Sequence, residues 1–184
     1  GNFFVVSAGI FISPAALGVF RLVQSGFGVI NMILQAYENY LTPKAAKIFD
    51  NKSKSEAASL IKNISIKFLG GIAIILLIII LGADTLIHFI QINDLITYSF
   101  VVKGMAILYI FILLNYPVRI FIRTAGQNHL FFEGYLLSLA FSLTSFKFLL
   151  QTWGISGAIA GLIFSQLLMM AFWQYKLSKL NNQL

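Results

Sequence analysis

The chain has 184 residues, of which 59% are hydrophobic and only 10% are charged, and its formal net charge is +7. Soluble domains carry roughly 25% charged residues, so this composition excludes most soluble proteins. Cysteine is absent, which excludes a disulfide framework, a cysteine-based metal site and a thiol nucleophile. The distribution of the positive charges indicates membrane orientation rather than a nucleic-acid partner.

Uncharged apolar segments recur along the whole chain, and the plainest of them runs from Phe68 to Ala83. Water cannot satisfy a backbone amide inside a bilayer, so each crossing must be a helix. We therefore predict an all-α integral membrane protein, with one transmembrane unit over residues 1–184. Its bundle of six transmembrane helices is expected at about 1–12, 15–41, 68–90, 95–122, 129–151 and 155–175.

Boundary signals define the first two crossings. The segment before Ser13 has about 12 residues, whereas a crossing needs roughly 20, so we expect the first helix to be truncated and to begin upstream. No basic region precedes it, unlike a secretory signal peptide. Ser13 is a good N-cap and Pro14 a good first residue for the second helix. Thr42 and Pro43 are expected to end that helix.

Later connections carry similar signals. Ser53 and Glu56 fit a capping box, which predicts an amphipathic cytoplasmic helix over about 53–67 that runs into the third crossing. Residues 91–94 form a polar turn, and Pro117 is expected to kink the fourth crossing. Trp153 and Gly154 mark a turn at a membrane interface.

Lysine and arginine are segregated between the two sides of these crossings. The loops near Ser13, Gln91 and Trp153 hold neither residue type. By the positive-inside rule the basic side, and with it the C-terminus, is cytoplasmic. The basic residues on that side are Lys44, Lys47, Lys52, Lys54, Lys62, Lys67, Arg119, Arg123, Lys176 and Lys179.

The second crossing is unusually polar. Its polar residues fall within an arc of about 140° on one helix face. On a lipid-facing surface they would be very costly, so they line either a water-filled cavity or a polar seam against another helix. These residues are Arg21, Gln24, Ser25, Asn31, Gln35, Glu38 and Asn39.

Three cations lie within crossings rather than in loops: Arg21, Lys103 and Lys147. At ~1.5 Å per residue each lies roughly 8 to 12 Å deep on the non-cytoplasmic side. If their helices converge, they form a site for a pyrophosphate or an acidic sugar. Alternatively, Arg21 and Lys147 snorkel to the outer surface.

Two acidic residues are candidates for ion coupling. Glu38 and Glu133 could bind a coupling proton or cation, or could instead be interfacial carboxylates near Arg119 or Arg123. His88 and His129 are expected on opposite sides of the ~30 Å hydrocarbon core and cannot share a metal. No metal site, cofactor or catalytic residue is therefore expected.

Small residues form a separate pattern that favours helix packing. Gly157, Gly161 and Ser165 repeat every four residues in the sixth crossing. A face of this kind lets two helices approach closely.

Several of these segments resemble one family. Residues 16–25, with Asn31 and residues 37–43, look like the opening of the C-terminal half of O-antigen and polysaccharide flippases. Residues 126–135 and 153–161 resemble the last two helices of the same family, which belongs to the multidrug/oligosaccharidyl-lipid/polysaccharide exporter superfamily.

The resemblance implies one lobe of a two-lobe, alternating-access transporter in a bacterial inner membrane. It implies a lipid-linked (undecaprenyl-pyrophosphate) oligosaccharide as substrate, held by Arg21, Gln24, Asn31, Gln35, Lys103 and Lys147. The expected partners are membrane lipids, an N-terminal lobe of the same protein and polysaccharide polymerase machinery. The alternatives are a multidrug/cation antiporter that depends on Glu38 and Glu133, and a membrane enzyme or scaffold of polysaccharide biosynthesis.

Overall fold

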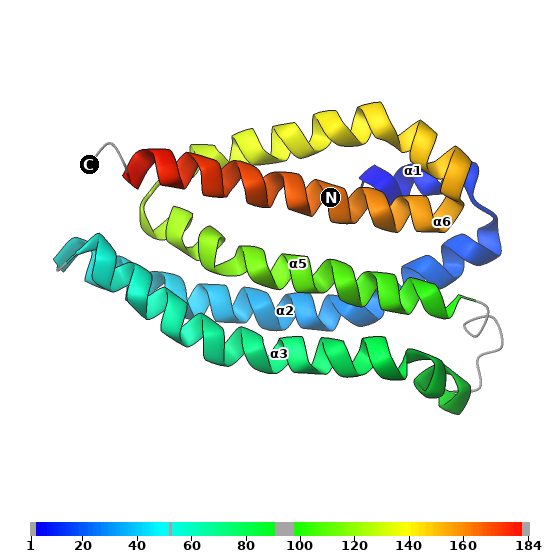
Figure 1. Cartoon of the computed structure of the whole chain (residues 1–184), viewed down its shortest axis with the longest axis horizontal. Helices are drawn as coiled ribbons and strands as arrows, with labels where there is room; N and C mark the ends of the chain where they lie inside the picture. Colours follow the sequence, from blue (N-terminus) through cyan, green and yellow to red (C-terminus); the bar gives the residue numbers. More distant parts are fainter. Residues whose placement is uncertain (1–2, 52, 91–97, 182–184) are drawn as a thin grey trace.

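The computed structural model describes residues 3–51, 53–90 and 98–181, and this part of the chain contains helices and short connections but no strand. The all-α class predicted from the sequence is therefore confirmed. Figure 1 shows long helices lying side by side along a common axis. The helices are α1 (Phe3–Phe11), α2 (Pro14–Asn51), α3 (Lys54–Ile90), α5 (Ser99–Thr124) and α6 (His129–Asn181).

Within the part of the chain that the structure describes, four helices, α2, α3, α5 and α6, are long and apolar enough to cross a membrane. The longest, α6, reverses at Gly154, whose positive φ of 53° suits glycine and makes the predicted turn. Its two arms, residues 129–153 and 155–181, lie side by side in Figure 1. These features fit a multi-pass membrane protein, while the count of six crossings and the two-lobe arrangement stay predictions.

Both predicted helix starts are confirmed. The Ser13 hydroxyl accepts a hydrogen bond from the amide of Ala16 at 3.4 Å, and α2 begins at Pro14. The Ser53 hydroxyl accepts one from the amide of Glu56 at 3.2 Å, and α3 then continues without a break to Ile90. The amphipathic segment and the third crossing therefore form one helix, as expected.

The predicted end of α2 at Thr42 and Pro43 is wrong, because the helix continues to Asn51. Proline removes one backbone hydrogen bond, but Pro43 is exposed, at a position where water can solvate the freed carbonyl. The Thr42 hydroxyl also donates to the carbonyl of Glu38 at 2.8 Å. The last arm likewise extends to Asn181, beyond the predicted end near residue 175. The polar turn at 91–94 lies outside the described residues.

The helix ends fall into two sets (Figure 1). The α2–α3 connection, the α5–α6 connection and the C-terminal end of α6 lie at one end of the bundle. We call this the basic end, because Lys44, Lys54, Arg123 and Lys179 are located there. The Gly154 turn and the α1–α2 connection lie at the opposite end. The charge segregation read from the sequence is therefore also a segregation in space.

Helix α5 is the centre of the bundle, with α2 and α3 on one side and α6 on the other (Figure 1). The Phe27 ring lies 5.0 Å from the Tyr109 ring, which joins α2 to α5. Gly104 brings α6 close, since a Cβ there would lie 2.9 Å from Ile159. The exposed side chains of α3 include Ile74, Ile78 and Leu81, so its outer face is apolar, as a bilayer requires.

The small residues of the last arm make close packing contacts, as predicted. A Cβ at Gly161 would lie 2.3 Å from the Phe4 ring of α1, and the hydroxyls of Ser165 and Ser142 are 3.4 Å apart. At Gly157 a Cβ would lie 1.9 Å from the carbonyl oxygen of Leu149. The hairpin within α6 therefore depends on glycine at this position.

We predict that Gly157→Ala lowers the free energy of unfolding by about 3 kcal/mol, because backbone rather than a flexible side chain would have to move. The matched control is Gly71→Ala, since a Cβ at Gly71 meets nothing within 4 Å. Thermal unfolding of the purified protein in detergent measures the difference. Equal melting temperatures for the two variants would contradict the tight hairpin.

Candidate functional site

A buried carboxylate joins α2 to α5 near the basic end. Glu38 is only 2% exposed. Its Oε2 lies 3.5 Å from Nη2 of Arg119, and its Oε1 lies 3.1 Å from Nε of Arg123. The two arginines are four residues apart on α5, so they share a helix face. We call these three residues the arginine cluster; it holds one negative and two positive charges.

Aromatic rings support the two guanidinium groups. The Arg119 guanidinium carbon lies 4.8 Å from the centre of the Tyr116 ring, and that of Arg123 lies 5.7 Å from the Phe131 ring. A guanidinium over an aromatic face gains a cation–π attraction that grows as water is removed. The rings therefore help to hold both cations at the seam between the helices.

Hydrogen bonding in this region is incomplete. Among the described residues, Nε of Arg119 and Oδ1 of Asn115 are buried and have no hydrogen-bond partner, and the same holds for Oε1 of Glu38 and Oε1 of Gln127. The amide nitrogen of Asn115 is engaged, because it donates to the carbonyl of Gln166 at 3.3 Å. An unpaired buried polar atom costs about 1–3 kcal/mol. A donor and an acceptor left unpaired one helical turn apart are the groups that a polar ligand would satisfy.

Asn115 and Arg119 line a cavity of about 260 Å³ between α2, α5 and α6, which we call the polar cavity. Four amides face it, together with one guanidinium and three large aromatic side chains. The lining residues include Gln24 and Asn31 of α2, Tyr109, Asn115 and Arg119 of α5, and Tyr135, Gln166 and Trp173 of α6.

Trp173 fixes the aromatic wall of the polar cavity. Its indole N–H donates to the carbonyl of Leu130 at 2.9 Å, so the ring has one orientation. Tyr135 meets it edge to face, with ring centres 6.2 Å apart and planes at 88°. Gly134 gives this ring room, because a Cβ there would lie 2.5 Å from Nε1 of Trp173.

The chemistry of the polar cavity suits an anionic ligand that forms many hydrogen bonds. Arg119 supplies positive charge, the amides supply donors and acceptors, and the aromatic wall can pack against the apolar face of a sugar ring. Among the residues that the structure describes, no group of three or more histidine or acidic side chains could hold a metal ion.

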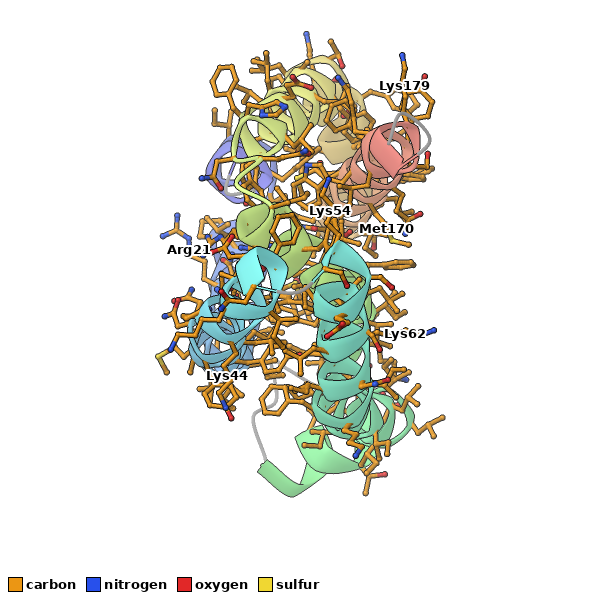
Figure 2. All side chains as sticks on the ribbon, turned by 90° about the vertical axis from the view of Figure 1, so that its left-hand side faces the viewer. Arg21, Lys44, Lys54, Lys62, Met170 and Lys179 are labelled. Carbon is orange, nitrogen blue, oxygen red and sulfur yellow. The ribbon has the colours of Figure 1, made fainter. Side chains whose placement is uncertain are left out.

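The structure places the predicted residues of the second crossing in three different environments: the polar cavity, the arginine cluster and the exposed surface. Gln24 and Asn31 line the polar cavity, and Glu38 lies in the arginine cluster beside it. Gln35 is exposed and does not line the polar cavity. Arg21 is also exposed, and Figure 2 shows it projecting away from the bundle on the α2 side.

The three cations predicted to form one anion site do not line the polar cavity. Nζ of Lys103 lies 2.6 Å from Oδ2 of Asp84, in an ion pair between α5 and α3. Lys147 is exposed on the first arm of α6. Lys103 is therefore paired with a carboxylate, and neither Arg21 nor Lys147 lines the polar cavity.

The two predicted ion-coupling carboxylates also have basic partners. Glu38 lies near Arg119 and Arg123, as one of the two interpretations of the sequence required. Glu133 instead pairs with Lys176 of the second α6 arm, with Oε2 and Nζ 2.9 Å apart. Each carboxylate is thus neutralised by a protein cation.

Sequence reasoning missed Arg119, Asn115 and Gln166 as cavity residues. The sequence marks Arg119 only as a cytoplasmic orientation charge and a possible neighbour of an acidic residue, and it gives neither amide a role. The signal present was the spacing of Tyr116, Arg119 and Arg123, which puts one ring and two cations on a single face of α5.

Comparisons with protein-family models, with curated proteins and with solved structures find no match to this chain.

We predict that Glu38→Ala lowers the free energy of unfolding by about 2–3 kcal/mol, because it leaves two partly exposed guanidinium groups at the seam without a counter-charge. The control is Asp50→Ala, which removes an exposed carboxylate from the end of the same helix. Thermal unfolding in detergent compares them. A loss no greater than that of the control would show that the arginine cluster does not stabilise the α2–α5 seam.

Proposed function

We propose that this chain is one lobe of an alternating-access transporter that translocates lipid-linked oligosaccharides across a bacterial inner membrane. The observation that carries the proposal is the polar cavity. It places a guanidinium, four amides and an aromatic wall inside a bundle of long apolar helices, of which α3 has an apolar outer face. Buried polar groups at membrane depth are costly and mark substrate pathways.

The lining groups match the parts of an undecaprenyl-pyrophosphate-linked sugar. Amides such as Gln24 and Asn31 can pair with sugar hydroxyls, and the exposed ring of Tyr135 can pack against a sugar ring. Arg119 can bind a phosphate oxygen, because a guanidinium forms strong charge-assisted hydrogen bonds with phosphate. The polyprenyl tail would stay in the bilayer.

The outer face of α2 supports the two-lobe part of the proposal. Arg21, Gln35 and Asn39 are exposed on this helix. In a bilayer such residues face water or another protein surface. A second lobe packed over this face would enclose them and complete a hydrated pathway. We further propose that the basic end and the C-terminus are cytoplasmic, following the positive-inside rule.

The antiporter alternative is less well supported. A cation antiporter needs a carboxylate that can exchange its proton for the transported cation. Glu38 faces two guanidinium groups and Glu133 faces Lys176, which all compete with an incoming cation. The enzyme and scaffold alternatives have no specific observation in their favour.

The test is transport by the full-length protein in proteoliposomes that contain a labelled undecaprenyl-pyrophosphate oligosaccharide. We expect Arg119→Ala to lower the translocation rate about tenfold or more, because it removes the phosphate-binding cation. Arg119→Lys keeps the charge but not the planar fork of donors, so its rate should be intermediate.

Lys47→Ala, an exposed cation at the basic end, is the control and should keep the wild-type rate. A wild-type rate in Arg119→Ala would remove the polar cavity from the pathway. A wild-type protein that moves a cationic drug but no lipid-linked sugar would favour the antiporter.

A second prediction separates function from stability. Asn115→Leu fills a similar volume and removes both the unpaired buried Oδ1 and the hydrogen bond from Nδ2 to the Gln166 carbonyl. Because the gain and the loss oppose each other, the free energy of unfolding should change by less than about 1 kcal/mol. Transport should nevertheless fall several-fold, since the ligand loses that acceptor. Thermal unfolding and the translocation assay on one preparation check both parts, and a loss of stability without a loss of transport would contradict the assignment.

A further inference from the structure

A second cavity has the opposite character to the polar cavity. It is a groove of about 580 Å³ between α3, α5 and the end of α6, and we call it the apolar groove. Small residues of α3 create the hollow, and larger apolar residues of α5 form its floor. Representative lining residues are Ala58, Gly70 and Ala73 of α3, and Ile110, Leu114 and Phe121 of α5.

The apolar groove offers almost no hydrogen-bonding capacity. Ser65 is one of two polar side chains that line it, and its hydroxyl is already engaged with the Tyr37 hydroxyl at 2.7 Å. No lining residue is among those with a buried polar atom that lacks a partner. A sugar or a phosphate would therefore gain nothing inside the groove, whereas a hydrocarbon chain would bury apolar area on every side.

Lys62, the other polar lining residue, adds a positive charge to the α3 wall of the apolar groove. It is exposed, and Figure 2 shows it projecting on the side of the bundle opposite to Arg21. The groove therefore opens away from the polar outer face of α2. A lysine at the polar boundary of a membrane typically extends its ammonium group to the headgroup layer.

The part of the apolar groove between Lys62 and Ala73 has a length that fits one leaflet. From Lys62 to Ala73 α3 advances by 11 residues, which at ~1.5 Å per residue is about 16 Å. The antiparallel stretch of α5 from Phe121 to Ile110 has the same length. Half of a ~30 Å hydrocarbon core is about 15 Å. A chain whose headgroup lies at Lys62 would thus end near the bilayer midplane.

We propose that the apolar groove binds one acyl chain of an anionic phospholipid from the leaflet at the basic end, with the lipid phosphate on Lys62. The apolar lining selects the chain, and the lysine selects the negative headgroup. This inference needs only that the bundle spans a membrane, and it does not depend on the transported substrate.

Native mass spectrometry of the full-length protein tests the proposal. The probes are phosphatidylglycerol and phosphatidylcholine with identical acyl chains. We expect wild-type protein to retain phosphatidylglycerol more tightly. Lys62→Ala should weaken that lipid about fivefold and leave phosphatidylcholine unchanged. Lys67→Ala, an exposed cation of α3 that does not line the groove, is the control and should change neither.

Two neighbouring glycines give a matched test of the acyl-chain site. A Cβ at Gly70 or at Gly71 meets nothing within 4 Å, but only Gly70 lines the apolar groove. Gly70→Leu should fill the groove and lower the affinity for both phospholipids about tenfold. Gly71→Leu should bind them like wild type. Thermal unfolding verifies that both variants fold, and Ala73→Leu, which also lines the acyl-chain part of the groove, replaces Gly70→Leu if that variant does not.

Equal phospholipid affinity for the two leucine variants would overturn the proposal. So would displacement of phosphatidylglycerol from wild-type protein by an equimolar amount of undecaprenyl phosphate, which would assign the apolar groove to a polyprenyl chain. The proposal is supported if Lys62→Ala and Gly70→Leu bind phosphatidylglycerol more weakly than wild type while Lys67→Ala and Gly71→Leu bind it like wild type.

Discussion

The packing of α2 against α5 is organised around the carboxylate of Glu38. A charge removed from water needs an opposite charge close to it, and in this bundle Arg119 and Arg123 supply it from one face of α5. Because both arginines must reach the same carboxylate, the rotation of α5 about its axis is restricted. That rotation also turns Asn115, one helical turn from Arg119, toward the polar cavity. The ion pair and the cavity are thus two consequences of one helix orientation.

Two hollows of different chemistry lie on different sides of α5. The polar cavity lies against α2 and α6 and contains polar atoms that lack partners. The apolar groove lies against α3, and its one lining hydroxyl is already paired. This division separates a surface suited to a hydrated ligand from one suited to lipid. It also explains why the polar residues of α2 and the plain apolar helix α3 occur in one small bundle.

Much of the fold was predictable, because the constraints that a bilayer imposes on a helix act on residues that are close together in the sequence. Uncharged runs such as Phe68 to Ala83 predict helices, since the backbone has no other way to satisfy its hydrogen bonds in lipid. Ser13, Ser53 and Gly154 marked helix boundaries through capping and positive φ, and the structure has each of them. Pro43 is misleading, because it lies inside α2 at an exposed position, where water can solvate the carbonyl that loses its hydrogen bond.

The sequence by itself determined the helical class, the helix starts after Ser13 and Ser53, the turn at Gly154 and the segregation of basic residues, because each depends on neighbours within a few turns. It also marked Gln24, Asn31 and Glu38 as polar residues that needed a protein or aqueous environment. Tertiary structure alone decided which cations meet which carboxylates. Helical periodicity gives a residue its face, but not the helix that packs against that face. Arg119 therefore lies with Glu38, Lys103 with Asp84 and Lys176 with Glu133, and Arg21 and Lys147 remain on outer surfaces.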